Sequence, residues 1–238
     1  MNNHYKNFTW LSKLDILINI CNGLKNIHQK QIIHRDLHTG NILFLIELLD
    51  EYYNGNICYI SDMGLCKEVS NIDNAVDETK IYGVMPYVAP EVLRGKPHTQ
   101  AADIYSFGMI MYFAATGRQP FANCAHDEFL ALDICKGTRP EINKLEAPKC
   151  YVDLMKKCWD SNPENRPTST ELYESLSQFN SINNPRHIIR NIRTKGDEIT
   201  RAGEDGIKRT SEDEIRKQFR EAEEYRIAKF QQLKIINQ

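Results

Sequence analysis

The chain has 238 residues, of which 41% are hydrophobic, and this is enough for one packed domain with or without a tail. A formal net charge of −2 provides no overall basic field, which argues against binding to nucleic acid or to a membrane surface. The N-terminal stretch MNNHYKNFTW lacks the apolar segment of a signal peptide, and no apolar run is long enough to span a bilayer. The seven cysteines are scattered without a C-x-x-C pair, as is typical of reduced thiols. We therefore expect an intracellular, cytoplasmic protein.

The first part of the chain predicts a helix, a β-hairpin and a long loop, in that order. Apolar residues recur at helical spacing from about Thr9 to Lys30, with Thr9 as the candidate N-cap. Two apolar runs of β-type composition, ILFLI and ICYIS, flank Asn54-Gly55, and Asn-Gly is a strong hairpin signal. Residues 65–86 show little periodicity, and long loops of this kind in compact domains are usually functional or disordered.

The rest of the chain predicts helices and one polar linker. We expect helices at about 90–94, 101–117, 126–136, 150–159 and 168–179. After Phe179 the composition is polar and nearly charge-balanced, which predicts a disordered linker at 180–210. Residues 211–236 predict a charged amphipathic helix that opens with a Ser211–Glu214 capping box. The simpler interpretation is a solvated tail helix, and the alternative is a partner-binding helix. The apolar stripe of this helix consists of Ile215, Phe219 and Ala222.

Five short motifs with chemically suited residues follow one another along the chain. They read IIHRDLHTGN, DMG, APE, DIYSFG and CWDSNPENRPT. The first places an acid and an amide five residues apart on one predicted loop, and the second places another acid directly after a predicted strand. Five such elements in this order and in suitable local context are very unlikely by chance. Their polar residues are, in chain order, Asp36, Asn41, Asp62, Glu91, Asp103 and Arg166.

This set of motifs resembles the protein kinase family, and within it the larger, helical C-lobe, over about residues 9–179. The stretches HRDLHTGN and PYVAPEVL are most similar to the tyrosine-kinase-like group. The resemblance implies a mainly α fold, a helical lobe with a short β-hairpin, which we assign to residues 1–179. It also implies ATP-dependent phosphoryl transfer to Ser/Thr or Tyr hydroxyls of protein substrates in signalling.

By their places in the motifs, five residues take roles at the reacting centre, because phosphoryl transfer demands positioning and charge neutralisation. Asp36 would accept the proton of the attacking hydroxyl. Asn41 and Asp62 would offer oxygen ligands to Mg²⁺ and thereby help to bind ATP. Leu43 would form the apolar floor beneath adenine. Gly64 would let the backbone turn sharply beside the metal.

Other matched positions imply structural or regulatory roles. Glu91 is expected to pair with a buried Arg166, and Asp103 is expected to hold the backbone of the catalytic loop. His34 would be a packed, hydrogen-bonded histidine. Arg35 stands where family members usually receive a phosphate from the long loop, which suggests regulation by phosphorylation. The candidate phosphosites in that loop are Ser70, Thr79 and Tyr82.

The chain departs from the family pattern in three places. A kinase N-lobe brings a Gly-rich loop over the phosphates, a strand Lys and a helix Glu. Here only Gly23 precedes Gly40, and no VAIK-like strand is found. We therefore expect the N-lobe β-sheet to be absent and phosphoryl transfer by this chain to be impaired. Ser/Thr kinases usually carry Lys at the place of His38 and Thr at the place of Val84, so acceptor specificity stays open between Ser/Thr and Tyr.

Three hypotheses remain on the sequence alone. The chain is an ATP- and Mg²⁺-dependent protein kinase, a non-catalytic kinase-derived module that docks a partner protein, or a truncated fragment. The retained Asp36, Asn41 and Asp62 favour an active ancestor, whereas the missing N-lobe motifs favour the other two. The surface that an N-lobe would cover is expected to be apolar and to promote self-association.

Overall fold

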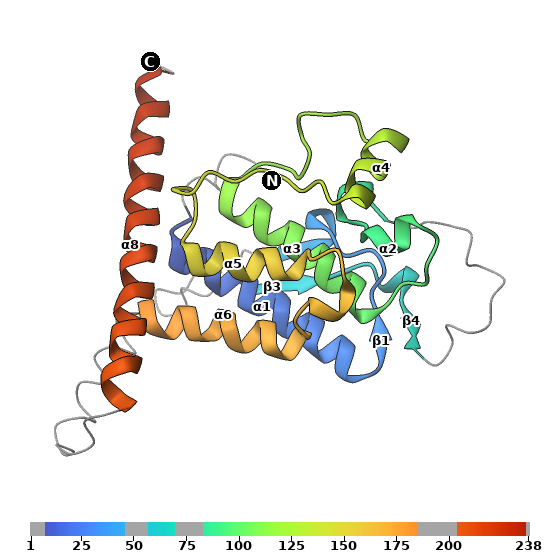
Figure 1. Ribbon diagram of the computed structural model, residues 1–238, viewed down its shortest axis with the longest axis horizontal. Coiled ribbons are helices and arrows are strands. Elements are labelled where there is room, and N and C mark those ends of the chain that lie inside the picture. The colour runs from blue at the N-terminus through green and yellow to red at the C-terminus, as the bar shows by residue number, and fades with distance from the viewer. Residues whose placement is uncertain (1–7, 46–56, 70–82, 185–203, 237–238) are drawn as a thin grey trace.

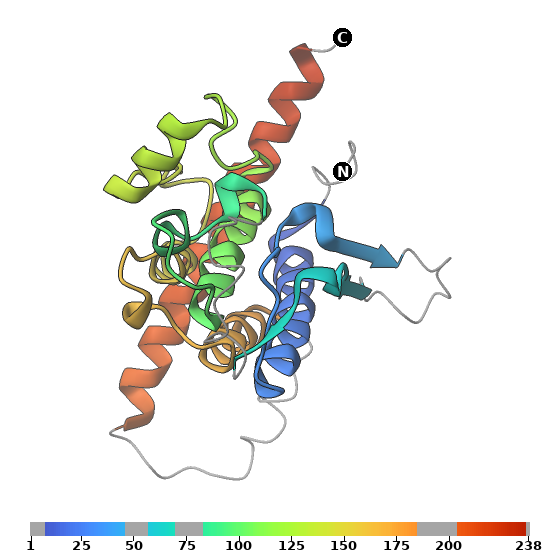
Figure 2. The same cartoon turned by 90° about the vertical axis from the view of Figure 1, so that its right-hand side faces the viewer.

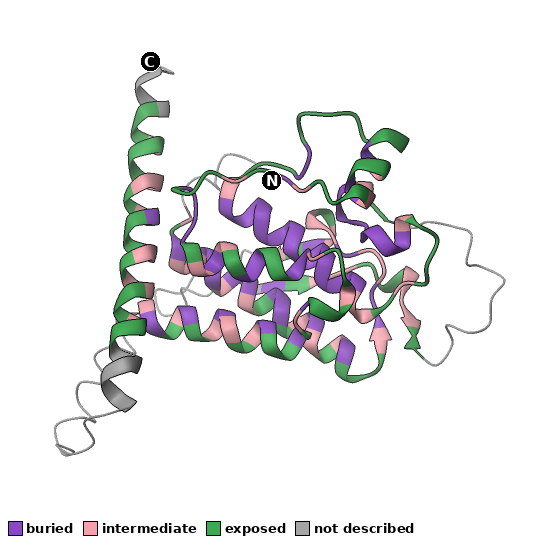
Figure 3. Ribbon diagram, in the orientation of Figure 1, coloured by how far each residue is buried: buried purple, intermediate pink, exposed green. Residues whose placement is uncertain are grey.

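The computed structural model describes residues 8–45, 57–69, 83–184 and 204–236. The chain forms a mainly helical lobe, as the sequence predicts, and it contains two small two-stranded sheets (Figure 1). The lobe is built around α3, Gln100–Thr116, whose residues from Ala102 to Ala115 are all buried (Figure 3). A helix that is apolar on all sides is typical of the centre of a domain. None of the helices that the structure describes is long and apolar enough to cross a membrane.

Two further helices complete this part of the lobe, one packed against α3 and the other along α1. In α5, Lys149–Cys158, the Tyr151 hydroxyl donates to the carbonyl of Met111 in α3 at 2.7 Å. Gly108 permits the close approach of these two helices, because a Cβ at this position would lie 2.9 Å from Cβ of Cys158. Helix α6, Ser169–Asn183, begins with a Thr168–Glu171 capping box and packs along α1.

Helix α1, Trp10–Gln29, leads through the short strand β1 into the expected catalytic loop, residues 34–41. Thr9 caps its N-terminus as predicted, because the Thr9 side chain accepts a hydrogen bond from the Ser12 amide. Its buried face repeats at helical spacing and meets α6, α3 and β3. The residues of this face include Leu14, Leu17, Cys21 and Leu24. Figure 2 shows the strands beside α1, on the side of the molecule away from α4, Glu128–Lys136.

The strands form two antiparallel pairs. The predicted hairpin strands are β2, Ile42–Leu45, and β3, Ile57–Ile60, with Ile42 opposite Ile60. Their predicted Asn54-Gly55 turn lies outside the described residues. The pair of β1, Ile32–Ile33, with β4, Lys67–Glu68, was not predicted, because two residues are too few to show an alternating pattern. The remaining short elements are α2, Pro90–Leu93, and single 3₁₀ turns at Thr39–Asn41, Met63–Leu65, Met85–Tyr87 and Pro163–Asn165.

The C-terminal helix α8 is longer than predicted and is not a solvated tail. It spans Glu204–Ile236, so Ser211 lies inside the helix and cannot open it as a cap. Figure 1 shows α8 crossing the ends of α1, α5 and α6, and it contacts all three. Phe219 is 3% exposed, and its ring lies edge-on to the Trp10 ring with the two centroids 5.8 Å apart. The centroid of the Phe179 ring lies 5.9 Å from that of Phe219. The apolar stripe is therefore covered by the lobe itself.

Polar contacts fix α8 in one register on the lobe. Glu223 accepts a hydrogen bond from the Trp10 amide at 3.0 Å, where the N-terminus of α1 has unpaired N–H groups and a positive dipole end. Burial raises the pKa of Glu223, but its contacts with Arg226 and the Trp10 amide lower it more, so the pKa lies below the ordinary value. Further along α8, Lys229 forms an ion pair with buried Glu146 at 2.8 Å. Helix α8 thus closes the N-terminal end of α1.

If α8 is part of the packed core, Phe219→Ala should destabilise the whole lobe. Removing a buried Phe side chain typically costs about 3–5 kcal/mol. We expect a clear fall in the midpoint of thermal unfolding followed by circular dichroism. Phe129→Ala is the matched control, because Phe129 is 68% exposed, and it should barely move the midpoint. Equal midpoints for the two variants would show that α8 does not support the fold.

Candidate active site

Asp103, at the start of α3, joins two segments that lie far from it in the sequence. Its carboxylate is buried, with Oδ2 accepting the His34 amide at 2.8 Å and Oδ1 accepting the Arg35 amide at 3.0 Å. The His28 ring, on α1, also donates Nε2–H to Oδ2 at 2.9 Å. Asp103 thus holds the backbone of the loop at His34 and Arg35. The contact with His28 was missed, because a lone histidine on a helix gives no sequence signal for its partner.

His34 ties the catalytic loop to the end of strand β3. The His34 side chain is fully buried, and its Nδ1 accepts the Asp36 amide at 3.3 Å. The proton of the ring is therefore on Nε2, which donates to the Ser61 carbonyl at 3.2 Å. His34 is the packed, hydrogen-bonded histidine that the sequence predicts. Between His34 and Asp36, Arg35 has a φ of 73°, a left-handed conformation that is unusual for a residue with a Cβ.

Asp36 and Asn41 face each other across the loop. The Asn41 Nδ2 donates to the Asp36 carbonyl at 2.9 Å and to Asp36 Oδ2 at 3.3 Å. These two bonds fix the orientation of the Asn41 amide relative to Asp36. Asp36 Oδ1 is buried and has no hydrogen-bond partner among the described residues. One carboxylate oxygen is thus held by a donor, and the other is available to a ligand.

Asp62 is brought to Asn41 by the pairing of β2 with β3. Ser61, the residue before Asp62, donates both its amide and its hydroxyl to the Asn41 carbonyl, at 2.8 and 3.0 Å. Asp62 itself has a φ of 61°, and its Oδ1 accepts the Gly64 amide at 3.3 Å. Asp62 is thus the left-handed residue here, and Gly64 lies in the 3₁₀ turn that follows it. Gly64 serves a close approach instead, because a Cβ there would lie 3.2 Å from Asp62 Oδ1.

The oxygen atoms collected here fit a hard divalent cation. They are the amide oxygen of Asn41 and the carboxylate of Asp62, both of which Mg²⁺ accepts as ligands. Asp36 Oδ1 is a buried acceptor without a donor, and this is the condition that a bound group with positive character would relieve. Leu43 is the second residue of β2, two positions after Asn41, and it pairs with Tyr59 on β3. Its side chain is 54% exposed.

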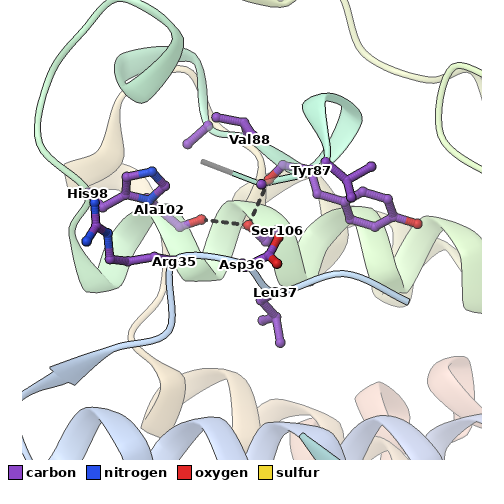
Figure 4. A pocket seen from close by; sticks show the side chains of 11 residues that line it. Arg35, Asp36, Leu37, Tyr87, Val88, His98, Ala102 and Ser106 are labelled. Carbon is purple, nitrogen blue, oxygen red and sulfur yellow. Dashed lines mark hydrogen bonds between the residues drawn. The ribbon is translucent and has the colours of Figure 1, made fainter. Parts of the chain in front are cut away.

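A small pocket of about 10 Å³, enough for about one water molecule, opens beside Asp36 (Figure 4). Gly83 forms one wall with a φ of 103°, and a Cβ there would lie 3.3 Å from Asp36 Oδ1. Tyr87 forms the floor, with its hydroxyl donating to Gln119 at 2.7 Å and accepting from Thr39 at 3.1 Å. Burial raises the pKa of Tyr87 to about 12, so its hydroxyl stays a donor at neutral pH. The Tyr87 contacts link the pocket wall to the catalytic loop.

The sequence indicates no role for two of the residues that line this pocket, Tyr87 and His98. Tyr87 belongs to no motif that carries chemistry. His98 lies beside Arg35 in Figure 4, and its Nε2 is buried without a hydrogen-bond partner among the described residues. Burial lowers the pKa of His98, and the Arg35 guanidinium lowers it further. The predicted phosphosites Ser70, Thr79 and Tyr82 all lie outside the described residues.

The expected pair of Glu91 and Arg166 is present, and it is bidentate. Arg166 Nη1 and Nη2 each donate to one Glu91 oxygen at 2.7 Å. Both side chains are buried, and Arg166 also donates to the carbonyls of Ala101 and Asp160, each at 2.9 Å. The guanidinium lies over the Tyr105 ring, 5.3 Å from its centroid. This fork joins α2, α3 and the loop before α6.

Comparison with known proteins identifies the family to which this lobe belongs. Residues 1–176 match the family model described as protein tyrosine and serine/threonine kinase. The chain is 32% identical over 188 residues to the serine/threonine-protein kinase roco5 of Dictyostelium discoideum, covering 75% of this chain and 6% of that protein. It is 30% identical over 179 residues to the serine/threonine-protein kinase STY17 of Arabidopsis thaliana, covering 75% of this chain and 29% of that protein.

The chain is therefore a member of the protein tyrosine and serine/threonine kinase family. The relatives named above carry serine/threonine-kinase names, in agreement with a kinase-type helical lobe. The chain spans less than a third of the length of either of these two relatives.

The Glu91–Arg166 pair should act on stability. Removing one partner of a buried ion pair leaves the other charge uncompensated and typically costs about 3–5 kcal/mol. We expect Glu91→Ala and Arg166→Ala each to lower the urea midpoint strongly. Lys149→Ala is the control, because it breaks an exposed pair with Asp153 and should leave the midpoint nearly unchanged. Midpoints for Glu91→Ala and Arg166→Ala equal to that of Lys149→Ala would contradict the structural role.

Proposed function

We propose that this chain supplies the acceptor and metal half of a serine/threonine protein kinase active site. A substrate hydroxyl oxygen attacks the terminal phosphorus of ATP, the bond to the ADP oxygen breaks, and the hydroxyl proton passes to Asp36. The observation that carries the proposal is the Oδ1 of Asp36, a buried oxygen without a hydrogen-bond partner among the described residues, on a residue that lines the pocket and whose Oδ2 is held by Asn41. A base must stand within hydrogen-bond reach of the proton that it accepts, and Asp36 lines the small pocket beside the loop.

Asn41 and Asp62 would hold the cation on the nucleotide side of Asp36. Mg²⁺ bound there would neutralise phosphate charge, which is the main need of phosphoryl transfer. The hydrogen bonds from Ser61 to the Asn41 carbonyl keep the two ligand-bearing segments together before any ligand binds. Such preorganisation reduces the reorganisation needed at the moment of reaction. His34 and Asp103 have no direct part in this chemistry, because their polar atoms are occupied in holding the loop.

The phosphate-clamping parts of the site are proposed to come from outside residues 1–238. No Gly-rich loop and no VAIK-like lysine are present in this sequence. The surface where such a lobe would sit exposes three large apolar side chains of the hairpin and its end, Leu43, Tyr59 and Met63. Exposed apolar patches mark interfaces or aggregation sites, so we expect the isolated chain to self-associate through this surface.

The choice of acceptor and the cellular setting belong to the same proposal. Serine/threonine names among the relatives favour Ser/Thr hydroxyls of protein substrates, within the tyrosine-kinase-like group. His38 and Val84 depart from the usual serine/threonine residues, and both lie beside the pocket at Asp36. Substrate proteins, a signalling role and an intracellular, cytoplasmic setting complete the proposal.

Calorimetry and a transfer assay together test this function. The isolated chain should bind Mg-ATP only weakly, because carboxylates without a phosphate-binding lysine repel the triphosphate. Fusion of an N-lobe from a related kinase should bring transfer of radiolabelled phosphate to a pool of Ser and Thr peptides. In that fusion, Asp36→Asn should lower kcat by a factor of about 10²–10³, the usual effect of losing one preorganised group.

Asp133→Asn is the matched control for the transfer assay. Asp133 is an exposed acid on α4, away from the catalytic loop, and its loss should leave kcat unchanged. Low-micromolar binding of Mg-ATP by the isolated chain would contradict the proposed dependence on an N-lobe. A fusion that folds and binds Mg-ATP but transfers nothing would instead favour the non-catalytic binding module.

A further inference from the structure

The His38 ring lies against the catalytic loop in one fixed orientation. Its Nδ1 accepts the Gly40 amide at 3.0 Å. A nitrogen that accepts a hydrogen bond carries no proton, so the ring proton of neutral His38 resides on Nε2. This Nε2 lies 3.5 Å from Asp36 Oδ1, the carboxylate oxygen that has no hydrogen-bond partner among the described residues. The tautomer thus directs an N–H group at the open oxygen of the proposed base.

Two neighbours keep the ring in this place. A Cβ at Gly40 would lie 2.7 Å from Cε1 and 2.9 Å from Nδ1 of His38, so only glycine leaves room for the ring where it is. On the pocket side, the ring centroid lies 6.0 Å from that of Tyr87, at an interplanar angle of 52°. The His38 side chain is 18% exposed. The imidazole is therefore held by the loop itself and by the buried Tyr87.

We propose that His38 is a positioning residue for Asp36. Asn41 Nδ2 holds Oδ2 at 3.3 Å, and His38 Nε2 approaches Oδ1 from the other end of the carboxylate at 3.5 Å. A donor at each of the two oxygens would fix the plane of the carboxylate, which one donor alone cannot do. The Nε2 distance is at the edge of hydrogen-bond reach, and catalytic contacts of this kind commonly shorten when the substrate binds. This inference rests on the proposed role of Asp36 as the base.

The orientation matters because Asp36 must present a lone pair to a hydroxyl in the pocket next to Gly83. A carboxylate free to rotate would spend much of its time with its lone pairs directed elsewhere, and misplacement of a reacting group by about 1 Å can cost about 10²-fold in rate. A neutral imidazole supplies an N–H donor without adding a positive charge next to the base. His38 therefore orients Asp36 while leaving its negative charge unpaired.

Nuclear magnetic resonance on the whole chain, labelled with ¹⁵N and ¹³C, tests the proposal without any nucleotide. The wild-type chain should show His38 as the Nε2–H tautomer, and the Asp36 carboxyl carbon should shift in His38→Asn. This variant separates two roles, because an Asn side-chain oxygen can still accept the Gly40 amide in an Asx turn but cannot reach Asp36. The Gly40 amide resonance should therefore stay close to its wild-type position.

Gly40→Ala provides a second, independent variant. It keeps the imidazole in the chain but displaces it, so the Asp36 carboxyl carbon should shift here as well, with a melting temperature close to wild type. An Nδ1–H tautomer of His38 in the wild-type chain would overturn the proposal. It would also be overturned by an Asp36 carboxyl resonance that stays unchanged in both folded variants. Because neither signal depends on Mg-ATP, failure of this inference can be told apart from failure of the proposed function.

Discussion

The buried carboxylate of Asp103 is the constraint on which the arrangement of the site depends. A carboxylate removed from water is stable only when donors replace its hydration, and Asp103 finds three of them, on α1 and on two consecutive loop amides. The same contacts hold Arg35 in its left-handed conformation. Since α3 is buried nearly all round, its position is set by the core. The catalytic loop is thereby tied to the most rigid element of the lobe.

From this anchor, each further residue of the site is placed by a short chain of hydrogen bonds. The His34 amide donates to the Asp103 carboxylate, and the His34 ring donates to the Ser61 carbonyl at the end of β3. The Ser61 amide in turn donates to the Asn41 carbonyl. Asn41 then holds Asp36. The residues proposed to react are thus at the end of a network whose other members are occupied. This division explains why so many conspicuous polar residues of the motifs have structural tasks.

A second set of contacts supports the lobe far from the reacting groups. The Glu91–Arg166 fork joins three segments on one side, and α8 closes the N-terminal end of α1 on another. The fork is built from two buried charges, and the ion pair of α8 with the lobe joins a partly exposed Lys229 to a buried Glu146. Helix α8 buries Phe219 against Trp10, so it is part of the core, and it lies on the opposite side of the lobe from α2 and β4 (Figure 1).

Much of this could be predicted from the sequence, because motif residues and helical periodicity carry the information locally. The helices of the lobe, the β2 and β3 strands, the Glu91–Arg166 pair and the hold of Asp103 on the loop were all predictable. The docking of α8 was not, because an apolar stripe looks the same whether a partner, solvent or the chain's own lobe faces it. The left-handed φ of Asp62 was not predictable either, because an aspartate after a strand gives no sign of it in the sequence.

Amide hydrogen exchange in Asp103→Asn tests the central claim most directly. An asparagine offers one acceptor oxygen in place of two, so the His34 and Arg35 amides should lose their charged acceptor. Hydrogen bonds to charged groups contribute about 1.5–3 kcal/mol, which corresponds to exchange faster by a factor of about 10–100. We predict this loss of protection at His34 and Arg35 beyond any change at the Phe179 amide, which reports on the core. Equal changes at all three amides, or none, would contradict the view that Asp103 organises the site.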